Sequence, residues 1–259
     1  MFSGLPVPHK RLSGHSQRGC EVKENLLLAH LPKKERKRLA PSLQPVELES
    51  RQILIEPEEP ITHVYFPHDA VISTTQQMKD GLAVEVGLTG VEGLVGVQLW
   101  LRSRTTPTTT LVQIPGGALR MSAKDFIREV RDKPSPLNHL IASYTHAFLS
   151  MTAQVAACNR LHGLDQRLCR WLRMVYNRVQ REEFPMRQEF IAQMLGVRRP
   201  TVSSTANILQ QAGLISYRRG RMSILDPEGL KEGACECYGI IEAQVDKVFD
   251  QPWIKLARD

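Results

Sequence analysis

The chain has 259 residues, of which 42% are hydrophobic and 24% are charged, and its formal net charge is +7. This composition is typical of a globular protein with one large domain or two ordinary ones, and it excludes a disordered chain. The charge is uneven, because residues 165–225 contain eleven Arg and no Lys against four acidic residues, whereas residues 226–259 are net acidic. Basic charge concentrated in one segment indicates a polyanionic partner, with a solvated basic face as the alternative.

The cysteines do not follow a disulfide or zinc pattern. Cys20, Cys158, Cys169, Cys235 and Cys237 are odd in number and contain no C-x-x-C pair. Cys235 and Cys237, with one residue between them and no histidine nearby in the sequence, are a poor zinc site, so we expect structural cysteines, no metal and no cofactor. No signal peptide and no apolar run long enough for a membrane span is found, so we expect a cytoplasmic protein without a membrane partner.

The first half of the chain combines a flexible arm, short helices and strands. Residues 1–20 are rich in Gly, Ser, Pro and basic residues, which is typical of a mobile arm. Short helices are expected at Asn25–Leu31 and Lys33–Ala40. Strand-like runs then follow at 53–55, 64–66, 71–72, 84–88 and 111–112, with turns at 56–57, 67–69, 79–81 and 115–117. Several short strands at this spacing predict a compact sandwich or barrel.

A long helix is predicted after Ser135, which can cap it, with Pro136 at its first position. Apolar residues then recur at alternating spacings of four and three, which is a heptad seam. The seam consists of Leu137, Ile141, Tyr144, Phe148, Met151, Val155 and Cys158. Such a seam favours a helix paired with its twin across a dimer axis, and the alternative is a helix packed on its own domain.

The basic segment has the order of a winged helix-turn-helix. A helix with a buried face of Leu168, Trp171, Leu172 and Val175 begins near Asp165, after a break at Gly163. A short helix at 187–195 ends at Gly196, and a second helix opens at Pro200 with Val202, Ala206 and Leu209 facing inward. Two strands at 214–217 and 222–225 then flank a basic turn.

Small polar and basic side chains on the open face of the second helix and on the hairpin are suited to base edges and phosphates. The candidate DNA-binding residues are Arg198, Arg199, Thr201, Ser203, Ser204, Asn207, Arg218, Arg219 and Arg221. The first group lies where a recognition helix enters the major groove, and the last three lie where a wing follows the sugar–phosphate backbone.

At this point the chain resembles the Crp/Fnr family of bacterial transcription regulators over residues 24–230. The stretches that carry the resemblance are ILIEPEEPITHVYFPHDAVIS, VEVGLTGVEGLVGVQLWL and FIAQMLGVRRPTVSSTANILQQAGLISYRRGRMSIL. The resemblance implies an N-terminal cyclic-nucleotide-binding-type β-roll, a long dimer helix and a C-terminal domain that reads palindromic DNA as a homodimer.

The effector is not settled by this resemblance. Gly93-Leu94 and Thr109-Thr110 stand where family members that bind cyclic AMP carry Gly-Glu and Arg-Ser or Arg-Ala, so a charge-assisted pair is missing and cyclic AMP is not expected. Arg102 and Arg104 are candidate substitutes for the phosphate-binding arginine. Cys20 alone cannot hold the iron–sulfur cluster of oxygen-sensing members, and His63 and His68 are more typical of surface histidines than of haem ligands.

The fold class expected is α+β with two domains. The boundaries are a flexible arm at 1–20, a β-roll effector-type domain (a cyclic-nucleotide-binding-like jelly roll) at 21–134, a dimerisation helix at 135–163, a winged helix-turn-helix at 164–232 and a helical extension at 233–259. The function expected is sequence-specific transcription regulation by a homodimer, with double-stranded DNA and RNA polymerase as partners. The alternative is a ligand-binding module that acts through protein contacts, and the sequence contains no motif that indicates an enzyme.

Overall fold

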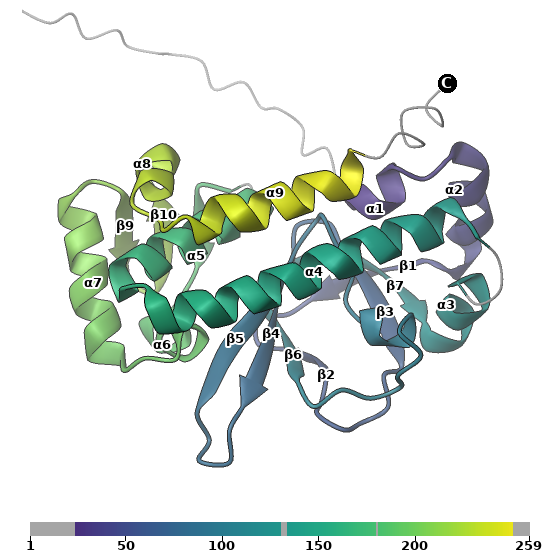
Figure 1. Ribbon diagram of the computed structural model, residues 1–259, viewed down its shortest axis with the longest axis horizontal. Helices are drawn as coiled ribbons and strands as arrows, with labels where there is room; N and C mark the ends of the chain where they lie inside the picture. Colours follow the sequence, from purple (N-terminus) through teal and green to yellow (C-terminus); the bar gives the residue numbers. More distant parts are fainter. Residues whose placement is uncertain (1–23, 131–133, 180, 251–259) are drawn as a thin grey trace, which may run out of the picture.

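The computed structural model describes residues 24–130, 134–179 and 181–250, so the predicted arm at 1–20 and Cys20 lie outside the described residues. It has an N-terminal β-roll, a long helix α4 along one side, and a C-terminal domain of helices and a small sheet (Figure 1). The predicted α+β fold with a β-roll and a winged helix-turn-helix is confirmed. No helix among the described residues is long and apolar enough to cross a bilayer.

The β-roll consists of two antiparallel sheets. One has the order β1-β7-β3, with β1 at Gln44–Leu48, β7 at Gly116–Ser122 and β3 at His63–Pro67. The other has the order β2-β6-β4-β5, with β2 at Ile53–Ile55, β6 at Thr109–Ile114, β4 at Val71–Gln77 and β5 at Ala83–Thr89. The predicted strand runs are confirmed, but the predicted turn at 115–117 is wrong beyond its first residue. The chain crosses from one sheet to the other at Pro115, and strand β7 begins directly after it.

Short helices close the ends of the roll. They are α1 (Leu26–Ala29), α2 (Lys33–Leu39), the 3₁₀ turns η1 (Ala40–Ser42) and η2 (Val97–Leu99), and α3 (Ala123–Val130). Asn25 caps α1 by accepting hydrogen bonds from the N–H groups of Leu27 and Leu28, and its amide donates to the carbonyls of Pro67 and Gly93. This buried asparagine therefore ties α1 to the loops of the roll.

Helix α4 spans Pro136–Leu161 and begins as predicted, because the Ser135 hydroxyl accepts from the Asn138 N–H and Pro136 lies in the first turn. The heptad seam faces the interior of the same chain. Six of its seven residues are buried and Phe148 is half-buried, and they pack on the cores of the β-roll and of the C-terminal domain. The prediction that this seam faces a twin helix is therefore wrong, and the alternative of a helix packed on its own domain is correct. The apolar face of α4 packs on the apolar residues of the β-roll and shields them from water.

The C-terminal domain contains α5 (Leu164–Val179), β8 (Glu183–Pro185), α6 (Gln188–Leu195), α7 (Arg199–Gln211), β9 (Ile215–Arg218), β10 (Arg221–Ile224) and α8 (Pro227–Glu232). Its sheet has the order β8-β10-β9. The predicted inner face of α5 is confirmed, since Leu168, Trp171, Leu172 and Val175 are at most 1% exposed.

Helix α9, Cys237–Phe249, runs back along α4 toward the β-roll (Figure 1). Its buried residues are Cys237, Tyr238, Ile241 and Val248. At its far end the Phe249 ring lies 4.8 Å from the ring of His30, next to α1. The segment after the wing therefore spans both domains and covers one side of α4.

Candidate nucleic-acid interface

The turn between α6 and α7 has helix-turn-helix geometry. Gly196 ends α6 with φ of 63°, and its N–H donates to the carbonyls of Ala192 and Gln193. Only glycine adopts this left-handed conformation without strain, and Pro200 then lies in the first turn of α7. Both sequence predictions for this turn are confirmed.

Helix α7 presents one buried and one open face. Val202, Ala206 and Leu209 are at most 5% exposed, as predicted, and they pack in the core of the domain. The open face carries Ser204, Asn207 and Gln211, with Thr201 at its edge. Ser203 lies toward α6, because its hydroxyl donates to the side-chain oxygen of Gln188. The polar side chains of Ser204, Asn207 and Gln211 are thus exposed to a base edge or a phosphate.

The amino end of α7 is basic. Arg198 and Arg199 are both exposed, and the first turn of the helix contains no acidic residue. No described side chain caps the free N–H groups of this end, which leaves them available to an anion. Arg199 pairs with Glu189 at 3.1 Å, but both side chains are more than half exposed, so a phosphate can compete for the guanidinium.

The hairpin between β9 and β10 is a two-residue turn. Arg218 pairs with Arg221 across the strands, and the turn residues Arg219 and Gly220 have φ of 52° and 75°. Positive φ at both turn positions is typical of a type I′ hairpin, which matches the twist of the strands. The turn projects exposed arginines from the domain, and Arg221 pairs with Glu183 of β8.

Two further exposed residues lie beside the predicted interface. Arg187 is exposed at the start of α6, and its side chain lies 3.9 Å from the Cβ position of Gly220 in the wing turn. Ile208 is 60% exposed on α7 and can contact a thymine methyl group. Ile208 could have been noticed in the sequence as an apolar residue outside the buried stripe of α7. Nothing in the sequence indicated Arg187, because only the tertiary structure places it next to the wing turn.

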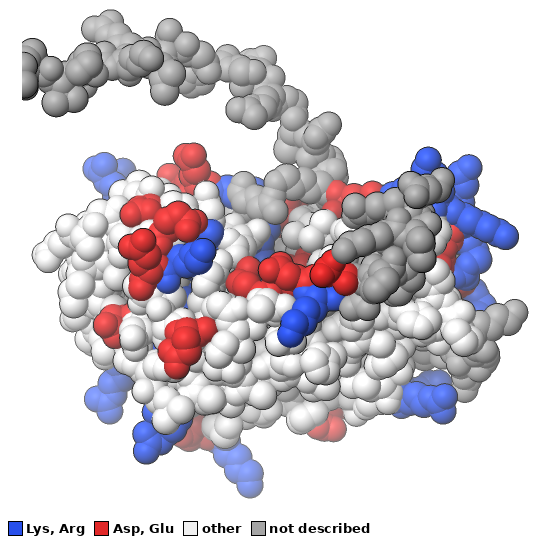
Figure 2. All heavy atoms as spheres, turned by 45° about the horizontal axis from the view of Figure 1, so that its top comes forward, with Lys and Arg blue, Asp and Glu red and all other residues white. Residues whose placement is uncertain are grey.

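The eleven arginines of residues 165–225 overstate the positive charge that is exposed to a partner. Arg167, Arg170 and Arg178 are at most 8% exposed, so their guanidinium groups are not accessible to a partner at the surface. Figure 2 also shows acidic side chains gathered on the face formed by α8 and α9, while basic side chains project from the edges. The exposed arginines of this segment therefore lie at the starts of α6 and α7 and on the wing, apart from Arg181, which pairs with Asp69.

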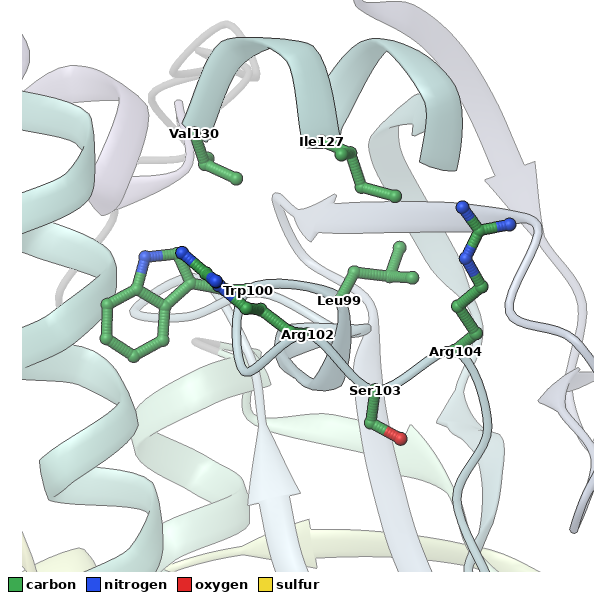
Figure 3. Close-up of a pocket in the computed structure, with 7 residues that line it drawn as sticks. All are labelled: Leu99, Trp100, Arg102, Ser103, Arg104, Ile127 and Val130. Atoms are coloured by element: carbon green, nitrogen blue, oxygen red, sulfur yellow. The ribbon is translucent and has the colours of Figure 1, made fainter. Parts of the chain in front are cut away.

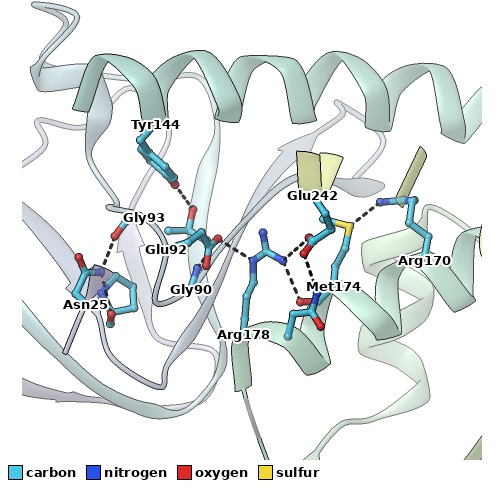
Figure 4. A network of polar contacts seen from close by, with 12 residues as sticks. Asn25, Gly90, Glu92, Gly93, Tyr144, Arg170, Met174, Arg178 and Glu242 are labelled. Carbon is cyan, nitrogen blue, oxygen red and sulfur yellow. Dashed lines mark hydrogen bonds and ion pairs between the residues drawn. The ribbon is translucent and has the colours of Figure 1, made fainter. Parts of the chain in front are cut away.

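A buried ion pair joins the two domains (Figure 4). Arg178 of α5 donates from Nε to Glu92 of the β-roll at 2.8 Å, and its Nη1 donates to the Met174 carbonyl at 3.0 Å. Both side chains of the pair are at most 7% exposed, and Glu242 of α9 lies 3.7 Å from the same guanidinium. The carboxylates of Glu92 and Glu242 outweigh burial and raise the pKa of Arg178 above its ordinary value.

A second polar contact crosses the same boundary. The indole N–H of Trp171 donates to Glu85 of β5 at 2.9 Å, and the Ser73 hydroxyl lies 2.7 Å from the other oxygen of this carboxyl. Burial raises the pKa of Glu85 to about 7, against the lowering effect of these hydrogen bonds and of Arg170. Nearby, Val84 of β5 contacts Gly196, so the roll touches the helix-turn-helix itself.

The residues predicted for the effector pocket do not share one cavity. Arg102 and Arg104 line an outer pocket of about 430 Å³ with Trp100 and with Ile127 and Val130 of α3 (Figure 3). Arg104 also borders an adjoining cavity of about 600 Å³ that includes Lys124 and Arg128. Leu94 and Thr110 border instead a separate cavity of only about 10 Å³, which holds one water molecule at most.

The interior of the roll is filled by α4. The ring of Tyr144 packs on Gly93 and occupies the space that a Cβ there would need, and its hydroxyl lies 2.9 Å from that of Thr89. Phe148 packs in the same way on Gly87. The predicted pocket of Gly93, Leu94, Arg102, Arg104, Thr109 and Thr110 is therefore wrong as one site, because Arg102 and Arg104 line the outer pocket, whereas Leu94 and Thr110 border a separate small cavity and Tyr144 packs on Gly93.

Comparisons with known proteins agree with this geometry. The family model of the Crp-like helix-turn-helix domain matches residues 166–232. A search of the curated proteins finds no match. Among solved structures, FixK2 from Bradyrhizobium japonicum is similar with a TM-score of 0.63 and 12% identity, over 74% of this chain and 98% of that one.

Two further structures show the same fold. The c-di-GMP responsive regulator CLP from Xanthomonas campestris has a TM-score of 0.58 and 16% identity, over 73% of this chain and 96% of that one. A CRP-family transcriptional regulator from Thermus thermophilus has a TM-score of 0.60 and 17% identity over the same shares. Residues 166–232 thus match the Crp-like helix-turn-helix domain, and the chain as a whole shares the fold of these solved transcriptional regulators.

Proposed function

We propose that the protein is a sequence-specific DNA-binding transcription regulator that acts as a homodimer. The observation that carries this proposal is the open face of α7, which combines Ser204, Asn207 and Gln211 with two exposed arginines at its amino end. In this arrangement α7 enters the major groove with its amino end first, and the wing arginines lie along the phosphate backbone. The alternative, a module that acts through protein contacts alone, does not explain a basic helix end without a cap.

The dimer requires a face of α4 other than the predicted seam. A second heptad pattern, displaced by two residues, consists of His139, Ala142, His146, Leu149, Ala153, Ala156 and Arg160. These residues are exposed or half-buried, and Leu149 is 58% exposed. Small residues at these positions let two helices approach closely, and the alternation of four and three keeps one face toward the partner. We propose that this face, which we call the outer α4 face, pairs with its twin.

Pairing along α4 places the two recognition helices at opposite ends of one DNA site. Half-sites would then lie about one helical turn apart, roughly 34 Å, which predicts a palindromic operator. The link at residues 162–164 joins α4 directly to α5, so a tilt of α4 is transmitted to the helix-turn-helix. RNA polymerase is the partner expected for an activator of this class.

Two regions of the β-roll are candidates for an effector-binding site. The outer pocket beside α3 offers Arg102 and Arg104 to an acidic small molecule. A ligand inside the roll would first have to displace Tyr144 from Gly93, which would move α4 itself. We propose the outer pocket as the effector site, because it is open without any rearrangement.

The test is the affinity of the purified full-length protein for duplex DNA from its own upstream region and for random duplex, measured by fluorescence anisotropy over a salt series. We expect selective binding by the unmodified protein. Arg199→Ala should weaken the specific complex by about 1–3 kcal/mol and the non-specific complex less. Arg219→Ala should weaken both complexes and reduce the salt slope by about one.

Lys34→Ala is the matched control, because it removes one exposed positive charge from α2, far from the helix-turn-helix. Its affinities and salt slope should equal those of the unmodified protein. Equal affinity for specific and random DNA in all proteins would favour the protein-contact alternative, and no binding at low salt would refute DNA binding altogether.

A further inference from the structure

A cluster of three cysteines and one histidine lies where α4 meets the start of α9. Cys158 and His162 are one turn apart at the carboxyl end of α4, Cys235 lies in the link between α8 and α9, and Cys237 is the first residue of α9. One ligand atom from each of the four residues lies within 4.8 Å of the other three. The three cysteines are at most 4% exposed and form a small buried group apart from the two apolar cores.

Two of the separations are close to those in a tetrahedral zinc site. Zinc with Zn–S bonds of about 2.3 Å and Zn–N bonds of about 2.0 Å holds its ligand atoms roughly 3.5–3.8 Å apart. In the protein the sulfurs of Cys158 and Cys235 are 3.4 Å apart, and the Cys237 sulfur is 3.5 Å from Nδ1 of His162. Three thiolates and one imidazole are a donor set typical of structural zinc sites.

The surroundings supply the contacts that zinc ligands need. Nε2 of His162 lies 3.3 Å from a carboxylate oxygen of Glu236, which orients Nδ1 toward the sulfurs. The amide of Gln154 donates to the Cys237 sulfur at 3.1 Å. Cys237 is also the first residue of α9, where the helix dipole stabilises a thiolate.

The charges nearby favour an anionic cluster. Two guanidinium groups, those of Arg167 and Arg170, are at most 8% exposed, and neither forms an ion pair with a carboxylate among the described residues. Three thiolates around a divalent ion carry one net negative charge, which two buried cations can balance.

We propose that Cys158, His162, Cys235 and Cys237 form a structural zinc site that clamps the last turn of α4 to the start of α9. The expectation that Cys235 and Cys237 have no histidine partner and hold no metal rested on sequence distance, and the fold brings His162 to them. Four protein ligands fill a tetrahedral shell and leave no position for a substrate, so the site is structural and not catalytic. Since α9 also contacts α5 and α1, the ion fixes the strap that joins the two domains.

The first measurement is the metal content of the full-length protein after purification and gel filtration without chelator. We expect about one zinc per chain by inductively coupled plasma mass spectrometry. Cobalt(II) added to the metal-free protein should give the intense visible bands of tetrahedral coordination and a thiolate-to-metal charge-transfer band in the near ultraviolet. Both readouts are independent of DNA binding, so their failure is distinguishable from failure of the proposed function.

Variants separate ligands from structural cysteines. Cys237→Ser and His162→Ala should lose the cobalt bands, whereas His162→Cys should keep the metal with a shifted spectrum. Cys169→Ser is the matched control, because Cys169 is buried on α5 outside the cluster. Glu236→Gln changes a side chain that is 70% exposed, so the fold is preserved while zinc affinity should fall about 10- to 100-fold.

Three outcomes would overturn the proposal. They are a folded wild-type protein that contains no zinc and takes up no cobalt, a Cys158–Cys235 disulfide in protein purified under reducing conditions, and equal metal content in Cys237→Ser and Cys169→Ser. If the unmodified protein contains zinc and Glu236→Gln binds it with the same affinity, only the role assigned to Glu236 is refuted.

Discussion

Glu85 at the boundary between the domains should make stability depend on pH. Its carboxyl is buried, accepts a hydrogen bond from Trp171, and has a pKa raised from the ordinary 4.5 to about 7, chiefly by burial. The folded protein therefore binds more protons than the unfolded chain between these two values. The contribution of this carboxyl to stability is fully present below about pH 4.5 and is lost as pH rises through about 7.

The size of the effect follows from the pKa difference. A pKa unit is worth about 1.4 kcal/mol, so the contribution lost between acid and alkaline conditions is about 3 kcal/mol. Glu85→Gln keeps an oxygen for the Trp171 N–H and offers an N–H to Ser73, but it does not titrate. The variant should therefore gain about 3 kcal/mol relative to the unmodified protein as pH rises from about 4 to about 8.

The assay is urea unfolding followed by circular dichroism at several pH values in this window. Glu59→Gln serves as the control, because Glu59 is an exposed carboxylate of the β-roll, and its curve should follow that of the unmodified protein. If the free energies of unfolding of Glu85→Gln and the unmodified protein stay parallel with pH, Glu85 titrates alike in both states and the argument from burial is refuted.

Three further outcomes are expected. Leu149→Lys should give a monomer by light scattering without a change in melting temperature, since Leu149 is 58% exposed. Leu82→Lys is the control and should leave the dimer intact, because Leu82 is 69% exposed on the β4–β5 hairpin. A Leu149→Lys variant that is still a dimer would exclude the outer α4 face. Arg178→Met should cost about 3–5 kcal/mol of unfolding free energy in urea, because it leaves Glu92 buried without its partner, and a loss below about 1 kcal/mol would show that the pair is solvated. Ser135→Ala should cost about 1 kcal/mol by removing the cap of α4, and an unchanged melting temperature would contradict that role.

The helix-turn-helix could be predicted because its signals are local. Gly196 and Pro200 act on the backbone at their own positions, and the stripe of Val202, Ala206 and Leu209 lies on one face at helical spacing. The Arg219-Gly220 turn likewise follows from residues that adopt positive φ at adjacent positions. These features need no partner from elsewhere in the chain.

The candidate sites depended on contacts that the sequence does not encode locally. An apolar heptad pattern on α4 shows that one face is buried, but the same pattern fits a twin helix and the chain's own β-roll. The outer pocket could not be predicted either, because Arg102 and Arg104 meet Ile127 of α3 only after the roll has closed.

The sequence by itself determined the order of the elements, the inward stripes of the helices and the recognition helix with its basic end, because backbone preference and periodicity act over a few residues. Only the tertiary structure decided which arginines are buried with Glu92, which face of α4 is open, and that His162 joins Cys235 and Cys237. These outcomes depend on residues far apart in the sequence, 86 positions for Arg178 and Glu92 and 75 for Cys237 and His162, and such contacts are set by how whole faces pack.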